Sequence, residues 1–252
     1  MINQMIHQII ISKMNNVSII ITAAGSSTRF GGSSKKEYLP YNHGTVLSNC
    51  VLSFLKADYG SKKISDIYIT VPKGRVNDSF EAIDVHKEVR DLLKEKNITI
   101  QFIDGGNTRQ ESIYHALTFM EKHSTYSSII LIHDGARPFV TTDLIENCVK
   151  AAEKYGAVVP AIEPIDTQKE ITPDGFIKRH LVRSNLRAVQ TPQAFDTVSI
   201  IQAYKQAMKT NKVYTDDTEI WDDFMTTKVK VIKGDVNNIK ITFPEDVRRL
   251  KW

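Results

Sequence analysis

Short runs of β-branched apolar residues alternate with helical patterns along most of the chain. The run over 17–22 (VSIIIT) is continuously apolar, as expected of a central strand that is covered on both faces. Strands joined by crossover helices form parallel sheets. The alternation therefore predicts an α/β fold with one mostly parallel sheet and helices on both faces. Further strands are predicted over 64–71, 99–104, 128–133, 158–162, 228–232 and 239–242, and helices over 45–55, 85–96, 108–122, 142–155, 197–209 and 217–224.

The segment over 166–190 interrupts this alternation. Short extended pieces flank the turn signal Pro173-Asp174-Gly175, and the basic residues Lys178, Arg179, Arg183 and Arg187 follow. At 25 residues the segment is too long for an idle connection and too polar for a core. We expect a β-arm over 164–190 that projects from the sheet.

Size and composition favour a single domain over 1–252. The chain is 41% apolar and 25% charged, and an excess of four basic residues, dispersed along it, does not favour nucleic-acid binding. No run reaches the roughly 20 apolar residues that a membrane helix needs. Cys50 and Cys148 lie in helix-like contexts without metal or redox spacing, which favours the cytoplasm. Residues 1–16 do not resemble a signal peptide, and we expect them to be a poorly ordered extension.

The loop after the first strand is a candidate phosphate site. In open parallel sheets, ligands bind at the carboxyl ends of strands. The loop contains small residues, beginning with Ala23, Ala24 and Gly25, and the cations Arg29 and Lys36. Small residues let backbone N–H groups approach a phosphate, and cations add charge. The spacing matches neither the Walker nor the dinucleotide pattern, so a nicotinamide or flavin enzyme is not indicated. A flexible connection is the alternative.

Two further strand ends carry candidate residues. Asp104-Gly105-Gly106 follows the strand over 99–104, although a Gly pair also suits a simple turn. Asp134 follows the strand over 128–133, within HDGARPF. Magnesium is often held by one or two carboxylates together with substrate phosphates, so Asp134 is a candidate ligand. The alternative is that Asp134 only caps a turn.

Six motifs together resemble one enzyme family. AAGSSTRFGGSSKKEYLP, DGGNTRQESI, HDGARPF, QTPQAF, TDD and NIKITFPED occur in this order between residues 23 and 246, as in the 2-C-methyl-D-erythritol 4-phosphate cytidylyltransferases. The resemblance implies a Rossmann-like nucleotidyltransferase sheet and a homodimer formed through the arm. It also implies transfer of CMP from CTP to 2-C-methyl-D-erythritol 4-phosphate, which gives 4-CDP-2-C-methyl-D-erythritol and pyrophosphate in the non-mevalonate isoprenoid pathway.

The resemblance also assigns residues. Such a transfer needs positioning and charge stabilisation at the α-phosphorus, and no covalent protein intermediate. Catalysis would fall to Arg29, Lys36 and Lys240, and Mg²⁺ binding to Asp134. The nucleotide would lie against Ala23, Ala24, Gly25, Asp104, Gly105, Gly106, Ser112 and Gly135. The acceptor would contact Arg137, Thr167, Arg183, Thr191 and Thr215.

The sequence departs from the family pattern at a few places, and other functions compete. Glu37 stands where the family usually has Gln, Gly135 replaces the usual Ala, and 183–187 matches loosely. Asn237 stands where some relatives have a carboxylate. The main alternative is a ribitol-5-phosphate cytidylyltransferase of wall teichoic acid synthesis. A more distant alternative is an inactive nucleotide-binding regulator, against which the four ionic residues Arg29, Lys36, Asp134 and Lys240 argue.

Overall fold

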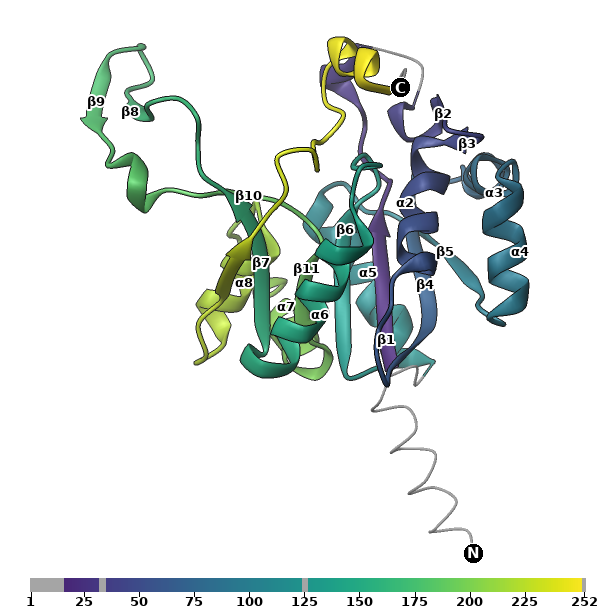
Figure 1. The fold of residues 1–252 in the computed structure, drawn as a ribbon. Coiled ribbons are helices and arrows are strands. Elements are labelled where there is room, and N and C mark those ends of the chain that lie inside the picture. The colour runs from purple at the N-terminus through teal and green to yellow at the C-terminus, as the bar shows by residue number, and fades with distance from the viewer. Residues whose placement is uncertain (1–15, 32–34, 124–126, 251–252) are drawn as a thin grey trace, which may run out of the picture.

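The computed structural model describes residues 16–31, 35–123 and 127–250, and its centre is an eight-stranded sheet (Figure 1). The sheet runs in the order β10-β7-β11-β6-β1-β4-β5, and β12 pairs with β7. Its strands are β1 (Asn16–Thr22), β4 (Lys63–Val71), β5 (Ile100–Asp104), β6 (Ile129–Asp134), β7 (Ala157–Ile162), β10 (Ala188–Val189), β11 (Gln193–Asp196) and β12 (Lys230–Lys233). Only the pairs that involve β10 and β11 are antiparallel. The predicted mostly parallel α/β fold is confirmed.

Helices cover both faces of the sheet, as predicted (Figure 1). On one face lie α2 (Val46–Lys56) and α6 (Thr142–Tyr155), with α3 (Val76–Asp84) and α4 (Lys87–Glu95) packed against α2. On the other face lie α5 (Arg109–Lys122), α7 (Thr197–Ala207) and α8 (Asp217–Phe224). Along β1, Ile19 and Ile21 join the first core and Ile20 joins the second. Because side chains alternate across a strand, a continuously apolar run is what a doubly covered strand requires.

The structure differs from the prediction in three places. The helix predicted over 85–96 is α4, and a separate helix, α3, precedes it. The antiparallel strand β11 was not predicted, because only Ala194 and Phe195 in it are apolar. The strand predicted over 239–242 is wrong. The Ile241 N–H donates to the Ala136 carbonyl, but no ladder of strand hydrogen bonds forms over these residues. The alternating pattern arises because Ile241 packs inward while Lys240 faces a cavity.

The arm is a hairpin that projects from the sheet, as predicted. Its strands β8 (Lys169–Ile171) and β9 (Ile177–His180) form a separate two-stranded sheet (Figure 1). Several apolar side chains on the arm are exposed, with Ile165 at 84% and Phe176 at 70%. Exposed apolar groups of this size favour contact with another surface.

The predicted extension over 1–16 lies outside the described residues, apart from Asn16, which begins β1. The short antiparallel pair β2 (Pro40–Tyr41) and β3 (Gly44–Thr45) precedes α2. None of the helices in the described ranges has the length and apolarity needed to cross a membrane.

Candidate active site

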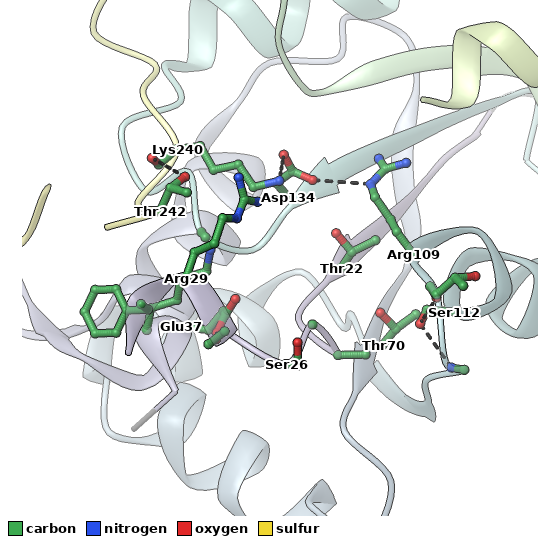
Figure 2. Close-up of a pocket in the computed structure, with 18 of the residues that line it drawn as sticks. Thr22, Ser26, Arg29, Glu37, Thr70, Arg109, Ser112, Asp134, Lys240 and Thr242 are labelled. Atoms are coloured by element: carbon green, nitrogen blue, oxygen red, sulfur yellow. Dashed lines mark hydrogen bonds and ion pairs between the residues drawn. The ribbon is translucent and has the colours of Figure 1, made fainter. Parts of the chain in front are cut away.

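A cavity of about 410 Å³ opens at the carboxyl ends of β1, β4 and β6 (Figure 2). Thr22, Thr70 and Asp134, near the ends of these strands, line it. The chain passes from β1 to β4 and β5 on one side and then returns to place β6 on the other. The cavity therefore lies at the switch point of the sheet, where open α/β sheets bind their ligands.

Close backbone packing forms the floor of the cavity. The Gly135 N–H donates to the Thr22 carbonyl at 2.9 Å, and the Gly105 N–H donates to the Val71 carbonyl at 2.8 Å. A Cβ atom at Gly105 would lie 2.3 Å from the Cβ of Ala24, so only glycine fits there. Of the predicted nucleotide residues, Ala24 and Gly25 line the cavity, whereas Ala23, Gly105 and Gly135 lie beneath or beside its wall.

The start of α5 supplies a second wall. Thr108 caps this helix by accepting a hydrogen bond from the Glu111 N–H at 3.0 Å. The Ser112 hydroxyl accepts from the Gly106 N–H at 3.0 Å and donates to the Thr108 carbonyl at 2.8 Å. Gly106 and Ser112, both predicted to bind the nucleotide, are thus held together at the cavity.

Asp134 is surrounded by cations. Its Oδ2 lies 2.9 Å from Lys240 Nζ, and its Oδ1 lies 3.4 Å from Arg109 Nε (Figure 2). Its Oδ2 also lies 3.2 Å from Arg137 Nε. Burial by itself would raise the pKa of Asp134, but Lys240, Arg109 and Arg137 hold it well below its usual range. Asp134 is therefore a permanent anion, and Arg137, predicted to contact the acceptor, is occupied by it.

A hydrogen-bonded chain beneath Asp134 fixes its backbone. The Asp134 N–H donates to the Thr191 hydroxyl at 3.0 Å, and this hydroxyl lies 3.0 Å from His133 Nδ1. His133 Nε2 lies 3.2 Å from the Arg137 carbonyl, which can only accept, so Nε2 carries the proton and Thr191 donates to Nδ1. Burial lowers the pKa of His133 to about 4, which keeps the ring neutral. Thr191, predicted to contact the acceptor, lies buried in this chain.

Arg109 connects Asp134 to a buried carboxylate that the sequence analysis did not identify. Both Nη atoms of Arg109 bind Asp217 at 2.7 Å, and the Tyr204 hydroxyl also donates to Asp217. Asp217 is the first residue of α8 and has no exposed surface. The TDD motif was a signal for Asp217, but nothing in the sequence marked Tyr204. The Arg109 guanidinium is therefore held by carboxylates on both sides.

Two other cations at the cavity are not neutralised in this way. Lys36 is only 9% exposed, and its ammonium has no hydrogen bond or ion pair with any described residue. Burial lowers the pKa of Lys36, since a desolvated ammonium is unfavourable. Arg29 also lines the cavity without an ion pair to the described part of the chain. Unpaired cations in a polar cavity call for an anionic ligand.

Glu37 is the second carboxylate among the described lining residues. It is 3% exposed, and its carboxylate accepts a hydrogen bond from its own backbone N–H and a long one from Ser27 Oγ at 3.5 Å. Burial raises the pKa of Glu37, and the charges of Lys36 and Lys35 oppose this rise. The ammonium of Lys35 donates to the Gly25 carbonyl. The two carboxyl groups of the cavity are therefore shifted in opposite directions, because the pKa of Asp134 is lowered and that of Glu37 is raised.

The lining residues suit a metal that arrives with a phosphate ligand. Within the described residues, no group of three His, Cys, Asp or Glu side chains could form a metal site by itself. Magnesium commonly takes one or two carboxylates, with phosphate and water completing its shell. Asp134 can supply one such oxygen from the cavity wall.

Besides Ala23, Gly105, Gly135, Arg137 and Thr191, four more predicted site residues do not line the cavity. Asp104 is exposed, and its Oδ1 accepts from the Gly74 N–H at 3.4 Å. Thr215 lies before α8 and is 3.5 Å from Glu219 Oε2. Thr167 and Arg183 lie on the arm, where Arg183 Nη1 donates to the Ile165 carbonyl at 2.7 Å.

Comparison with known proteins agrees with the resemblance of the motifs. The family model described as 2-C-methyl-D-erythritol 4-phosphate cytidylyltransferase matches residues 17–251. A protein of that name from Clostridium beijerinckii is 38% identical over 232 residues, which cover 92% of this chain and 95% of that protein. One from Bacillus thuringiensis is 34% identical over 91% of this chain and 94% of its own length. The crystal structure of 4-diphosphocytidyl-2C-methyl-D-erythritol synthase from Anaerococcus prevotii superposes with a TM-score of 0.74 and 28% identity, covering 95% of this chain and 96% of that one.

Proposed function

The chain belongs to the 2-C-methyl-D-erythritol 4-phosphate cytidylyltransferase family. On this premise we propose that the cavity is the site where CMP is transferred from CTP to 2-C-methyl-D-erythritol 4-phosphate. The enzyme transfers CMP from CTP to 2-C-methyl-D-erythritol 4-phosphate and releases pyrophosphate, a step of isoprenoid synthesis. The observation that carries the assignment of the cavity is the buried, unpaired Lys36 beside Arg29 at the switch point of the sheet.

The cations of the cavity would act on the α-phosphorus of CTP. A phosphate oxygen of the acceptor attacks this phosphorus, the bond to the β-phosphate oxygen breaks, and pyrophosphate departs. Negative charge builds on the non-bridging oxygens, and fixed cations stabilise it. Lys36 and Arg29 would contact the phosphates from the first loop, and Lys240 would approach from the opposite wall. Backbone groups near Ala24, Gly25 and Gly106 would bind the cytidine.

Nucleotidyltransferases commonly use a divalent metal, and we propose Mg²⁺ with Asp134 as its protein ligand. The metal supplies positive charge to the triphosphate. Asp134 is fixed in position by the hydrogen bond from its backbone N–H to the Thr191 hydroxyl and by its side-chain contacts with Lys240 and Arg137. Because the carboxylate stays ionised, it can offer an oxygen to a hard cation at any ordinary pH.

The arm is proposed to complete the acceptor site in a homodimer. Thr167 and Arg183 lie on the arm and do not line the cavity of their own chain. The exposed apolar residues Ile165, Ile171 and Phe176 offer a surface for a second copy. An arginine suits phosphate because its planar group can bind two oxygens at once. The proposed setting is the cytoplasm, in keeping with the two free, buried cysteines, and neither nucleic acid nor a membrane is a proposed partner.

A direct assay tests this function. The purified protein is incubated with CTP, Mg²⁺ and either 2-C-methyl-D-erythritol 4-phosphate or ribitol 5-phosphate, and pyrophosphate release is followed. We expect release with the first acceptor. Release with ribitol 5-phosphate alone would show that the acceptor is wrongly assigned, whereas release with neither would contradict the catalytic assignment.

A further inference from the structure

We infer that CTP binding in this cavity takes up one proton from solvent at Glu37, so that the nucleotide is held with Glu37 as a neutral carboxylic acid. The inference rests on the proposed function, since it concerns the same cavity. It adds a residue that tunes nucleotide affinity and makes that affinity depend on pH.

The geometry separates Glu37 from the other carboxylate of the cavity. Asp134 has three cationic nitrogens within 3.4 Å. Glu37 is 3% exposed, and its carboxylate accepts a hydrogen bond from its own backbone N–H and a weak one from Ser27 Oγ at 3.5 Å. Burial favours the neutral form of Glu37, whereas Lys36 and Lys35 favour its ionised form, so a ligand that changes the charge near these lysines can change its protonation. Two carboxyl groups whose environments push their protonation apart can take different roles in one site.

The charges that face Glu37 do not close an ion pair on it. Lys35, its neighbour, donates to the Gly25 carbonyl instead. Lys36 is attracted by both Glu37 and Asp134, whereas the cations Lys240 and Arg29 repel it. Among the described residues, no basic side-chain nitrogen forms a salt bridge with a Glu37 carboxylate oxygen at 4.0 Å or less. The ionisable groups that act on or lie beside Glu37 are Lys35, Lys36 and Tyr38 of its own segment, Arg29 of the first loop and Cys50 of α2.

A bound triphosphate shifts the protonation equilibrium of Glu37 towards the carboxylic acid. The phosphates bring negative charge next to Lys36 and Arg29, which draws those cations away from Glu37. Added negative charge near a carboxyl group raises its pKa. The proton comes from solvent and bonds to a carboxylate oxygen of Glu37. Once neutral, the group can donate a hydrogen bond to the ligand, which a carboxylate cannot do.

Calorimetry with matched variants tests the inference. CTP is titrated with Mg²⁺ into the wild type, Glu37→Gln and Glu81→Gln in two buffers of different ionisation enthalpy. Glu81 is an exposed residue of α3 outside the cavity. Glu81→Gln therefore makes the same replacement of a carboxyl group by an amide, but away from the CTP site. Proton exchange by CTP and Mg²⁺ themselves is common to all three proteins. The difference between proteins therefore isolates Glu37.

The wild type and Glu81→Gln are expected to take up more protons per CTP than Glu37→Gln. The CTP dissociation constant of the wild type relative to that of Glu37→Gln is expected to rise with pH, by up to about tenfold for each unit by which the ligand raises the Glu37 pKa. Infrared difference spectra of the wild type should gain a carboxylic acid band when CTP binds, a readout that does not need the variant. Equal proton uptake in all three proteins, with CTP bound and no acid band, would overturn the inference and leave the nucleotide site intact. Failure of the wild type to bind CTP would instead overturn the proposed function.

Discussion

The cavity and the arm both carry charged side chains, but they hold them differently. At the cavity, Asp134 is buried and contacts Lys240, Arg109 and Arg137, and Asp217 is buried behind the cavity wall, where it contacts Arg109. On the arm, Glu170 pairs with Lys178 and Arg179, and both cationic side chains are more than half exposed. A buried pair fixes geometry because neither partner can be replaced by water, whereas an exposed pair does not. The proposed nucleotide half of the site is thus built by one chain, whereas the proposed acceptor residues on the arm need the surface of a second chain.

The largest expected effect is on the buried pair of Arg109 and Asp217. Asp217→Asn removes the charge that two guanidinium nitrogens contact at 2.7 Å. Breaking such a buried pair should lower the free energy of unfolding by about 3 kcal/mol, measured by urea denaturation. Asp222→Asn, on the exposed face of the same helix, is the control and should be neutral. A loss in Asp217→Asn no greater than in the control would mean that the cavity wall does not depend on this pair.

Lys36→Ala should affect catalysis more than folding. The ammonium has no partner among the described residues, so its loss breaks no ion pair seen in the fold, but it removes charge from the proposed transition state. We expect kcat to fall roughly 10²-fold or more in steady-state assays, with the Tm near that of wild type. Lys122→Ala, at the exposed end of α5, should behave as wild type. An unchanged kcat would remove Lys36 from the mechanism.

Asp134→Asn should weaken the contribution of Mg²⁺ to CTP binding by about tenfold, because an amide is a poorer ligand for a hard cation. Without metal, CTP should bind the variant at least as well as the wild type, since Lys240, Arg137 and Arg109 lose their anion. Calorimetry with and without Mg²⁺ separates these two effects. If the metal strengthens binding equally in both proteins, Asp134 is only a structural anion.

Mixing two inactive proteins tests whether the arm works in the partner's site. Arg183→Ala lacks the proposed acceptor contact and Lys36→Ala lacks the proposed catalytic cation. If the arm acts across a dimer, random exchange makes half of the dimers mixed, and each has one intact site. The mixture should then recover about a quarter of wild-type activity. Activity that stays at the level of the separate variants, with exchange demonstrated by mass spectrometry, would place the arm in its own subunit's site.

Glu170→Gln is the matching test on the arm and should have the smallest effect. Its partners Lys178 and Arg179 are exposed, and water can replace the contact. No measurable change in Tm is expected in a thermal scan of the protein. A clear drop would show that the arm is held more firmly than its exposed pairs indicate.

The sequence predicted those parts of the molecule that short-range patterns determine. The run over 17–22 is β1, and the pattern over 217–224 is α8, because periodicity and capping are local. The loops that follow the strands were identified as ligand-binding regions for the same reason, and Ser112 and Lys240 do line the cavity.

Long-range contacts explain what the sequence did not show. Tyr204 reaches Asp217 from another helix, and no spacing relates Asp217 to Arg109, which precedes it by 108 residues. The extended segment over 239–242 resembles a strand in its pattern, but the first loop, α2 and Asp134 occupy its two sides. The proposed roles of Thr167 and Arg183 depend on a second chain, which the sequence of one chain cannot place.

The contact between Gly105 and Ala24 has an evolutionary consequence. A methyl group at position 105 would lie 2.3 Å from the Ala24 Cβ and 2.9 Å from Ser112 Oγ, and these atoms belong to two different walls of the cavity. Position 105 therefore cannot accept a larger residue while Ala24 and Ser112 stay as they are. Any lineage that enlarged residue 105 would have had to reshape two walls of the cavity at once.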